Sequence, residues 1–205
     1  MNSTYDATWL PIERQAAGGE DPTALAVEYV DRRCTQTQQP GVLVTHTRGD
    51  LATPSLEWFA EKHRHVTRRS HSDVSPGSGP VLVDMPDADL LALAHFLARG
   101  TSLCAMESGA LRLNGWAAAT HAVDLVTEEH VAPLTEEVLK LLEHLIFAGN
   151  SGWADEPGKR DAQRLLRSLA SADTSLDADF IAGFVIGRGK SSAAAKRLHK
   201  MFPTT

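Results

Sequence analysis

The sequence is poor in cysteine and contains no long hydrophobic run. Cys34 and Cys104 are far apart and neither belongs to a C-x-x-C pair, which favours two reduced thiols over a disulfide framework. No apolar stretch approaches the ~18 residues that a membrane-spanning helix needs, and no charged segment followed by an apolar one begins at Met1. We therefore expect a cytoplasmic protein that has no membrane partner and is not secreted.

Sequence motifs of several enzyme classes are also missing. There is no G-x-S-x-G nucleophile elbow, no H-E-x-x-H helix and no glycine-rich loop after the first expected strand. Gly189-Lys190-Ser191 looks like the end of a phosphate-binding P-loop, but Phe184 occupies the position of the motif's first glycine and a predicted helix precedes it. This segment is therefore predicted to be a turn between two helices with a serine cap. The sequence predicts no cofactor and no metal site.

The chain does have the composition of an ordinary globular protein. Its 205 residues are 42% hydrophobic and 22% charged, which is enough for one compact domain or for a main domain with a smaller satellite. Arginine outnumbers lysine by 14 to 6 and alanine is abundant. We associate this bias with GC-rich bacterial genomes.

Short apolar runs alternate with helix-like segments between residues 41 and 128. The runs are continuously apolar, which is typical of strands that are covered on both faces. They predict an α/β fold with a small, mostly parallel sheet and flanking helices. The expected strands are 42–45, 81–83, 102–106 and 124–126, and the expected helices are 55–65, 87–99 and 115–123. Residues 70–80, which are rich in Ser, Gly and Pro, are predicted to form an exposed loop.

The two ends of the chain are predicted to be helical. Residues 1–40 are expected to form a helical arm outside the core, with a helix over 23–33 that begins after Asp21-Pro22. From residue 129 to 205 the apolar spacing predicts a bundle of about four helices. Thr174 and Asp177 resemble a capping box for the third of these helices, and Ser191 or Ser192 can cap the last.

Trp153 lies in the polar loop between the first two helices of this bundle. We expect it to anchor the loop, and the alternative is a stacking surface for a nucleic-acid base.

The charge changes sign along the chain. Nine basic and four acidic residues from Lys159 onward give this part a charge of +5, so the overall charge of −6 leaves −11 on the first 158 residues. Such asymmetry points to a polyanionic partner, and two helices joined by a Gly-containing turn have the outline of a helix-turn-helix. The leading hypothesis is a binding protein that contacts DNA or RNA through its basic C-terminal helices. The candidate side chains are Arg160, Arg164, Arg167, Arg188, Lys190, Lys196, Arg197 and Lys200. The alternative is a solvated basic face.

A second basic cluster follows the first helix of the expected core. It contains Lys62-His63-Arg64-His65, Arg68, Arg69 and His71. Arginines repel a metal cation, so a phosphate group suits this cluster better than a metal ion. The alternative is an exposed helix end.

Polar residues at the carboxyl ends of the expected strands predict a second class of function. In a parallel sheet, ligands bind at this edge near a point where the strand order reverses. Thr45 to Arg48 follow the first expected strand, Asp84 follows the second, and Glu107 with Ser108 follows the third. His46, Asp84 and Glu107 are candidate catalytic residues for nucleotide or phosphate-ester chemistry. A protein-interaction adaptor is a third hypothesis, and the α/β part could also form a homodimer.

Overall fold

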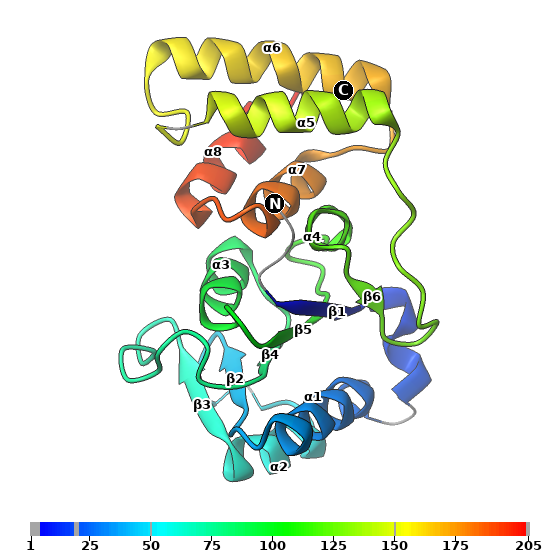
Figure 1. Cartoon of the computed structure of the whole chain (residues 1–205), viewed down its shortest axis with the longest axis vertical. Coiled ribbons are helices and arrows are strands. Elements are labelled where there is room, and N and C mark those ends of the chain that lie inside the picture. Colours follow the sequence, from blue (N-terminus) through cyan, green and yellow to red (C-terminus); the bar gives the residue numbers. More distant parts are fainter. Residues whose placement is uncertain (1–4, 19–20, 50, 150, 204–205) are drawn as a thin grey trace.

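Six parallel strands form one sheet between two layers of helices (Figure 1). The computed structural model describes residues 5–18, 21–49, 51–149 and 151–203. The strands are β1 (Asp6–Leu10), β2 (Val42–Thr45), β3 (Arg64–Thr67), β4 (Val81–Val83), β5 (Ser102–Met106) and β6 (Val123–Asp124). Their order across the sheet is β3-β2-β4-β5-β1-β6. The predicted α/β class with a parallel sheet is therefore confirmed.

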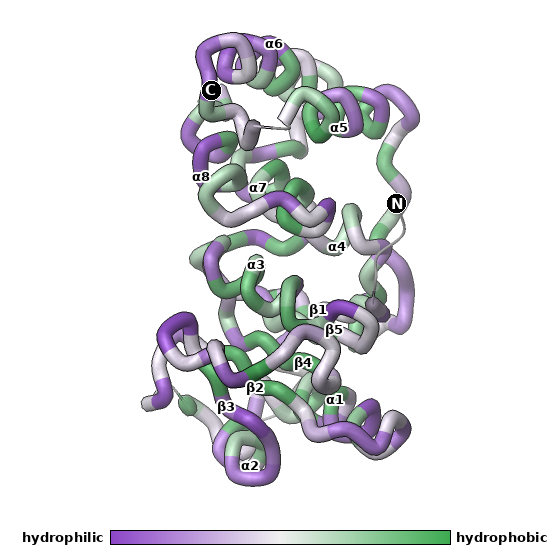
Figure 2. The backbone as a smooth tube through the Cα atoms, turned by 60° about the vertical axis from the view of Figure 1, so that its left-hand side comes forward, coloured by the Kyte–Doolittle hydropathy of each residue, from purple (hydrophilic) through white to green (hydrophobic). Residues whose placement is uncertain are grey.

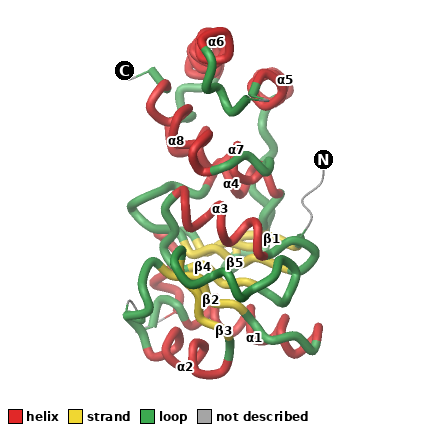
Figure 3. The backbone as a smooth tube through the Cα atoms, turned by 90° about the vertical axis from the view of Figure 1, so that its left-hand side faces the viewer, coloured by secondary structure: helices red, strands yellow, loops and turns green. Residues whose placement is uncertain are grey.

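Both faces of the sheet are covered, as the continuous apolar runs indicated. Every residue of β2, β4 and β5 is buried. On one face, α1 (Ala24–Thr37) and α2 (Pro54–Lys62) pack on Leu43, Leu82 and Cys104. On the other, α3 (Ala88–Leu97) and α4 (Asn114–Thr120) pack on residues that include Val44 and Val83. Figure 3 shows the sheet between these two layers. We call them the α1 face and the α3 face.

The C-terminal helices stack on the layer formed by α3 and α4 (Figures 1 and 2). They are α5 (Glu136–Ala148), α6 (Glu156–Ala172), α7 (Ala178–Gly187) and α8 (Ser192–Met201). α7 is buried all round because it lies between α4 and the other helices. A Cβ atom on Gly115 would lie 1.9 Å from the Phe180 carbonyl oxygen, so only glycine allows α4 and α7 to approach this closely. One hydrophobic cluster runs from the α3 face of the sheet to α8.

Side-chain caps define most of the helix starts. Ser191 caps α8, because its hydroxyl accepts a hydrogen bond from the Ala194 amide at 3.3 Å. The capping box predicted from Thr174 is wrong. Asp177 is itself the cap of α7, and its carboxylate accepts from the Phe180 amide at 2.7 Å. The short aspartate side chain reaches the amide three residues on, so the helix starts later than the box predicted.

The prediction of a helical arm over residues 1–40 is wrong at residues 6–10, and residues 1–4 and 19–20 of that arm lie outside the described part of the chain. Residues 6–10 form β1, which lies inside the sheet between β5 and β6. Its register pairs Asp6 with Ser102 and Leu10 with Met106. The strand contains Asp, Thr and Trp among its five residues, so it is not a continuous apolar run. Its backbone hydrogen bonds are formed with β5 and β6, which are distant in sequence. The helix after Asp21 was predicted correctly, and it extends to Thr37.

The sheet also contains a strand that we did not predict. β3 follows α2 within the basic cluster, where the sequence indicated only a helix end. It pairs with β2 along its whole length, from Val42 opposite Arg64 to Thr45 opposite Thr67. The last expected strand, 124–126, forms one residue earlier as β6 at Val123–Asp124.

Trp153 anchors its loop, as predicted. The side chain is fully buried, and a Cβ atom on Gly149 would lie 2.2 Å from its ring. The indole is therefore packed against the chain and offers no stacking surface for a base. None of the described helices is both long and apolar enough to cross a membrane.

Candidate anion-binding site

The strand connections create two positions where a ligand can approach the carboxyl edge of the sheet. β2 and β4 are neighbours, but β2 leads to α2 on the α1 face and β4 leads to α3 on the opposite face. β1 and β5 are also neighbours, and they lead to α1 and α4 on opposite faces. Ligands of open parallel sheets bind in the crevice that forms where neighbouring connections diverge in this way.

The position between β1 and β5 is filled by the chain's own Glu107. Its carboxylate accepts hydrogen bonds from the Ile12 amide at 3.0 Å and the Leu113 amide at 2.8 Å. The Gln15 side-chain amide donates to the Glu107 carbonyl at 2.6 Å. Glu107 is only 2% exposed, and these backbone amides satisfy its buried carboxylate. Glu107 does not line the cavity that contains His46 and Asp84, the other two candidate catalytic residues.

The position between β2 and β4 is open. A cavity of about 380 Å³ is lined there by residues that include Thr45, His46, Leu51 and Asp84. Two of the three candidate catalytic residues, His46 and Asp84, are thus brought to one cavity. The His46 ring lies 3.1 Å from the Met85 carbonyl oxygen, which directs Nε2 toward the loop after β4. Asp84 is only 8% exposed.

A second and larger cavity adjoins the first at His46. It has a volume of about 720 Å³ and is lined by His46, Thr47, Arg48, Thr67, Arg68, Arg69 and Ser70. All three arginines are exposed. Within the described part of the chain, Arg68 pairs with Asp89 at 2.7 Å and neither Arg48 nor Arg69 forms an ion pair. This cavity combines unpaired guanidinium groups with hydroxyl donors, which is the donor set that phosphate oxygens require.

Hydrogen bonds hold the two loops of this cavity in place. The Thr45 hydroxyl donates to the Thr47 carbonyl at 2.7 Å, so it accepts from Nε2 of His65 at 2.7 Å. Burial lowers the pKa of His65, and the nearby charge of Arg48 lowers it further. The neutral ring therefore links β3 to the end of β2 without repelling the arginine. The Ser70 hydroxyl accepts from the Thr67 amide at 3.1 Å and fixes the turn after β3.

Part of the basic cluster and part of the strand ends thus line one cavity. The sequence indicated that Arg68 and Arg69 belong to a cluster suited to binding phosphate and that His46 and Arg48 follow a strand. It did not indicate that these residues lie close together. They meet because β3 pairs in parallel with β2, which brings the carboxyl ends of both strands to one edge. The signal that could have revealed this is the segment Arg64–Thr67, in which a β-branched pair, Val66 and Thr67, follows the predicted helix end.

The proposed nucleic-acid residues of the C-terminal helices are largely occupied by partners within the chain. Arg188 pairs with Glu143 at 2.5 Å, and Lys196 pairs with Asp89 at 2.5 Å. Arg197 donates to the Gly152 carbonyl, and Lys190 donates to the Gly149 carbonyl. These side chains therefore link α8, α5, α3 and the loop at Gly149 and Gly152, and the charges of Arg188 and Lys196 are paired with carboxylates.

The remaining cations of that set lie mainly on α6. Arg160, Arg164 and Arg167 are exposed on the side of α6 opposite its buried leucines. Arg164 pairs with Asp161 on the same helix at 3.1 Å. Lys200, near the end of α8, is also exposed. Exposed pairs of this kind contribute little energy, so the α6 arginines stay available to solvent.

No protein-family model, no curated protein and no solved structure matches this chain.

Proposed function

We propose that the protein binds a phosphate ester or nucleotide at the carboxyl ends of β2, β3 and β4. The observation that carries the proposal is the joining of Arg48, Arg68 and Arg69 around one cavity at a divergence of the strand connections. The two adjoining cavities, of about 720 Å³ and about 380 Å³, are in the size range of small-molecule sites. The larger one supplies cations for the phosphate, and the smaller one has apolar walls at Leu51 and Met85 for the organic part.

The same arrangement provides groups for acid–base chemistry. His46 and Asp84 line the smaller cavity, where a bound ester would lie between them and the arginines. Histidine and carboxylate side chains are the usual proton carriers in hydrolysis and transfer reactions. The proposal therefore includes turnover of a phosphate ester, with His46 and Asp84 as the groups that move the proton.

Titration calorimetry with inorganic phosphate and with a nucleoside monophosphate tests the proposal. One charge-assisted hydrogen bond contributes about 1.5 kcal/mol, so Arg48→Ala and Arg69→Ala should each weaken binding about tenfold. Arg32→Ala is the matched control, because Arg32 is an exposed arginine on α1, away from the site. Equal affinity in all four proteins, or no binding at low salt, would refute the site. Phosphate release from a monoester should be lost in His46→Ala if the site is catalytic.

The exposed arginines of α6 favour a second candidate function, which is contact with DNA or RNA. Arg160, Arg164 and Arg167 lie on one solvent-facing side of a helix, where they can meet phosphates of a nucleic-acid backbone. Changing all three to alanine should reduce the slope of log affinity against log salt by about 3. An unchanged slope would remove α6 from any such interface.

Compartment and assembly are also part of the proposal. Cys34 and Cys104 are free, buried thiols, and burial raises the pKa of Cys34 to about 11 and that of Cys104 to about 12. Such thiols fit a reducing cytoplasm. The homodimer stays a prediction, which light scattering of the purified chain tests.

A further inference from the structure

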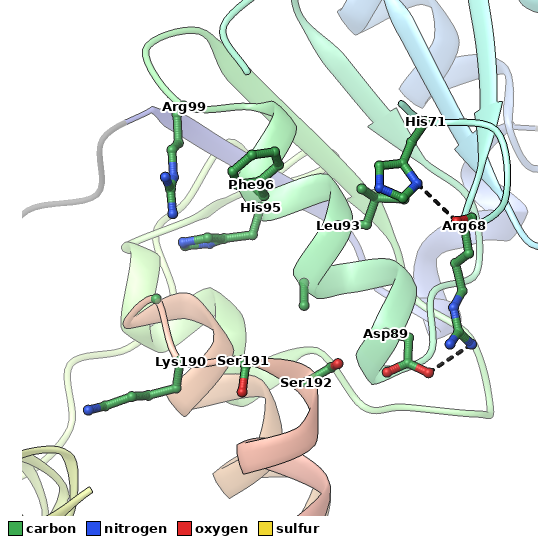
Figure 4. A pocket seen from close by; sticks show the side chains of 12 residues that line it. Arg68, His71, Asp89, Leu93, His95, Phe96, Arg99, Lys190, Ser191 and Ser192 are labelled. Atoms are coloured by element: carbon green, nitrogen blue, oxygen red, sulfur yellow. Dashed lines mark hydrogen bonds and ion pairs between the residues drawn. The ribbon is translucent and has the colours of Figure 1, made fainter. Parts of the chain in front are cut away.

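A third hollow lies between α3 and the start of α8, next to the candidate site. Its volume is about 470 Å³, and Figure 4 shows its walls. Asp89 and His95 of α3 form one wall together with Arg99, which follows the helix. Ser191 and Ser192 at the α8 start form the other, and Arg68 closes one end. We call this hollow the α3–α8 groove.

The three hollows are consecutive because they share wall residues. Arg68 lines both the α3–α8 groove and the larger strand-end cavity. His46 lines both strand-end cavities. The hollows are therefore neighbours, and Arg99, Arg68, Arg69 and Arg48 line them in turn; we call this row of hollows the path. A single phosphate ester would occupy only part of this row, because four arginines line it.

The charges along this path favour a polyanion. Asp89 is the acidic residue of the groove, and it is already engaged by Arg68 at 2.7 Å and Lys196 at 2.5 Å. Burial would raise the pKa of Asp89, but hydrogen bonds from Lys196 and Ser192 and the charges of Lys196 and Arg68 lower it. The carboxylate is thus ionised and balanced by two cations. Arg99 adds a further positive charge at the outer end.

The groove also contains an exposed aromatic ring. Phe96 is 40% exposed, and the Arg99 guanidinium lies 4.9 Å from the ring centroid. Figure 4 shows both side chains at the same end of the groove. Proteins that bind single strands combine a positively charged groove with aromatic side chains on which bases stack. A duplex, whose bases are already stacked, gains nothing from such a ring.

We propose that the path from the α3–α8 groove to the strand ends binds single-stranded nucleic acid. The backbone phosphates contact Arg99, Arg68, Arg69 and Arg48 in turn, and a base stacks on Phe96 beside Arg99. This inference rests on the proposed phosphate site and extends its ligand from one nucleotide to a strand. It differs from the α6 candidate, because it uses the carboxyl edge of the sheet and α3.

Fluorescence anisotropy with labelled oligothymidylates of about two and about twelve nucleotides tests the inference, since single-strand sites span about 4–16 nucleotides. The longer strand should bind at least tenfold more tightly at low salt, and more tightly than a duplex of the same length. The loss of one stacked base costs about 1–3 kcal/mol of binding free energy, so Phe96→Ala should weaken binding of the longer strand roughly fivefold to 150-fold. Arg99→Ala should weaken it and lower the salt slope by about 1.

Two matched variants control for general effects of lost surface. Phe147→Ala removes a 79% exposed phenylalanine from α5, and Arg32→Ala removes an exposed arginine from α1. Neither should change the affinity for the longer strand. Phe96→Ala and Arg99→Ala should also leave the affinity for inorganic phosphate unchanged, because that anion occupies the strand-end cavity.

The outcomes separate this inference from the phosphate site. If phosphate binding depends on Arg48 but long and short strands bind equally, the inference is overturned and the phosphate site stands. Equal or tighter binding of the duplex, with dependence on the α6 arginines, also overturns it. If neither phosphate nor any oligonucleotide binds, both proposals fall.

Discussion

Acidification should destabilise the protein through protonation of His95. His95 lies on α3, with Nδ1 2.8 Å from the Tyr5 hydroxyl, and the Trp116 indole donates to the same hydroxyl at 3.2 Å. Burial lowers the pKa of His95, and the nearby charge of Arg99 lowers it further, to about 4. The folded state therefore binds a proton at His95 less readily than the unfolded chain does, whose histidine has a pKa of about 6.5.

The sign and size of the effect follow from this difference. A histidine whose pKa is depressed on folding contributes its full stability above the unfolded pKa and loses it as the pH falls toward the folded pKa. With values of about 6.5 and about 4, His95 should lower the free energy of unfolding by about 2 kcal/mol between pH 7 and pH 5, and His65, whose pKa is also lowered, adds to the fall. The carboxyls of Asp21, Asp31 and Asp89 have lowered pKa values, so they stay ionised in this range.

Urea unfolding at pH 7 and pH 5, followed by circular dichroism, measures this change. His95→Gln keeps a side-chain acceptor for Tyr5 and removes the titrating ring, so its stability should change by about 2 kcal/mol less than that of the parent protein over the same range. His144→Gln is the control, because His144 is exposed on α5 and should leave the pH dependence of the parent protein intact. If His95→Gln and the parent lose equal stability, the assignment of this pH dependence to His95 is wrong.

Three further predictions concern single contacts. Glu107→Gln should lower the unfolding free energy by about 1–3 kcal/mol, because an amide cannot accept from both backbone amides, and calorimetry should show unchanged phosphate binding. Gly115→Ala should lower the free energy of unfolding by about 3 kcal/mol or more, because its Cβ atom would clash with the Phe180 carbonyl. Gly109→Ala is the control in thermal unfolding, and it should be nearly neutral because no atom lies within 4 Å of the added Cβ. Asp89→Asn should tighten phosphate binding about threefold at low salt, because Arg68 then has no carboxylate partner. Weaker binding in this variant would show that Asp89 positions Arg68 for the phosphate.

Local signals in the sequence determined a large part of the fold. Strands 42–45, 81–83 and 102–106 were predicted at their observed positions, because a run of apolar residues is stable only where both faces are covered. The start of α8 was predicted from Ser191 or Ser192, and Ser191 is the cap, since a cap needs only an amide three residues away. The sequence also showed, as separate features, the polar residues at the strand ends and a cluster of arginines suited to binding phosphate.

The tertiary structure decided which of these features belong together. β1 and β3 carry polar and charged residues, so their strand conformation depends on partners such as Ser102 for β1 and Val42 for β3 that are distant in sequence. The sign of the charge near the carboxyl end was plain in the sequence, but Lys196 meets Asp89 only because α8 packs on α3. The local sequence pattern shows which residues of a segment can be buried. It does not show which strand pairs with which, or which charges form ion pairs. Those contacts depend on how distant segments pack, because hydrogen bonds and ion pairs act only at short range.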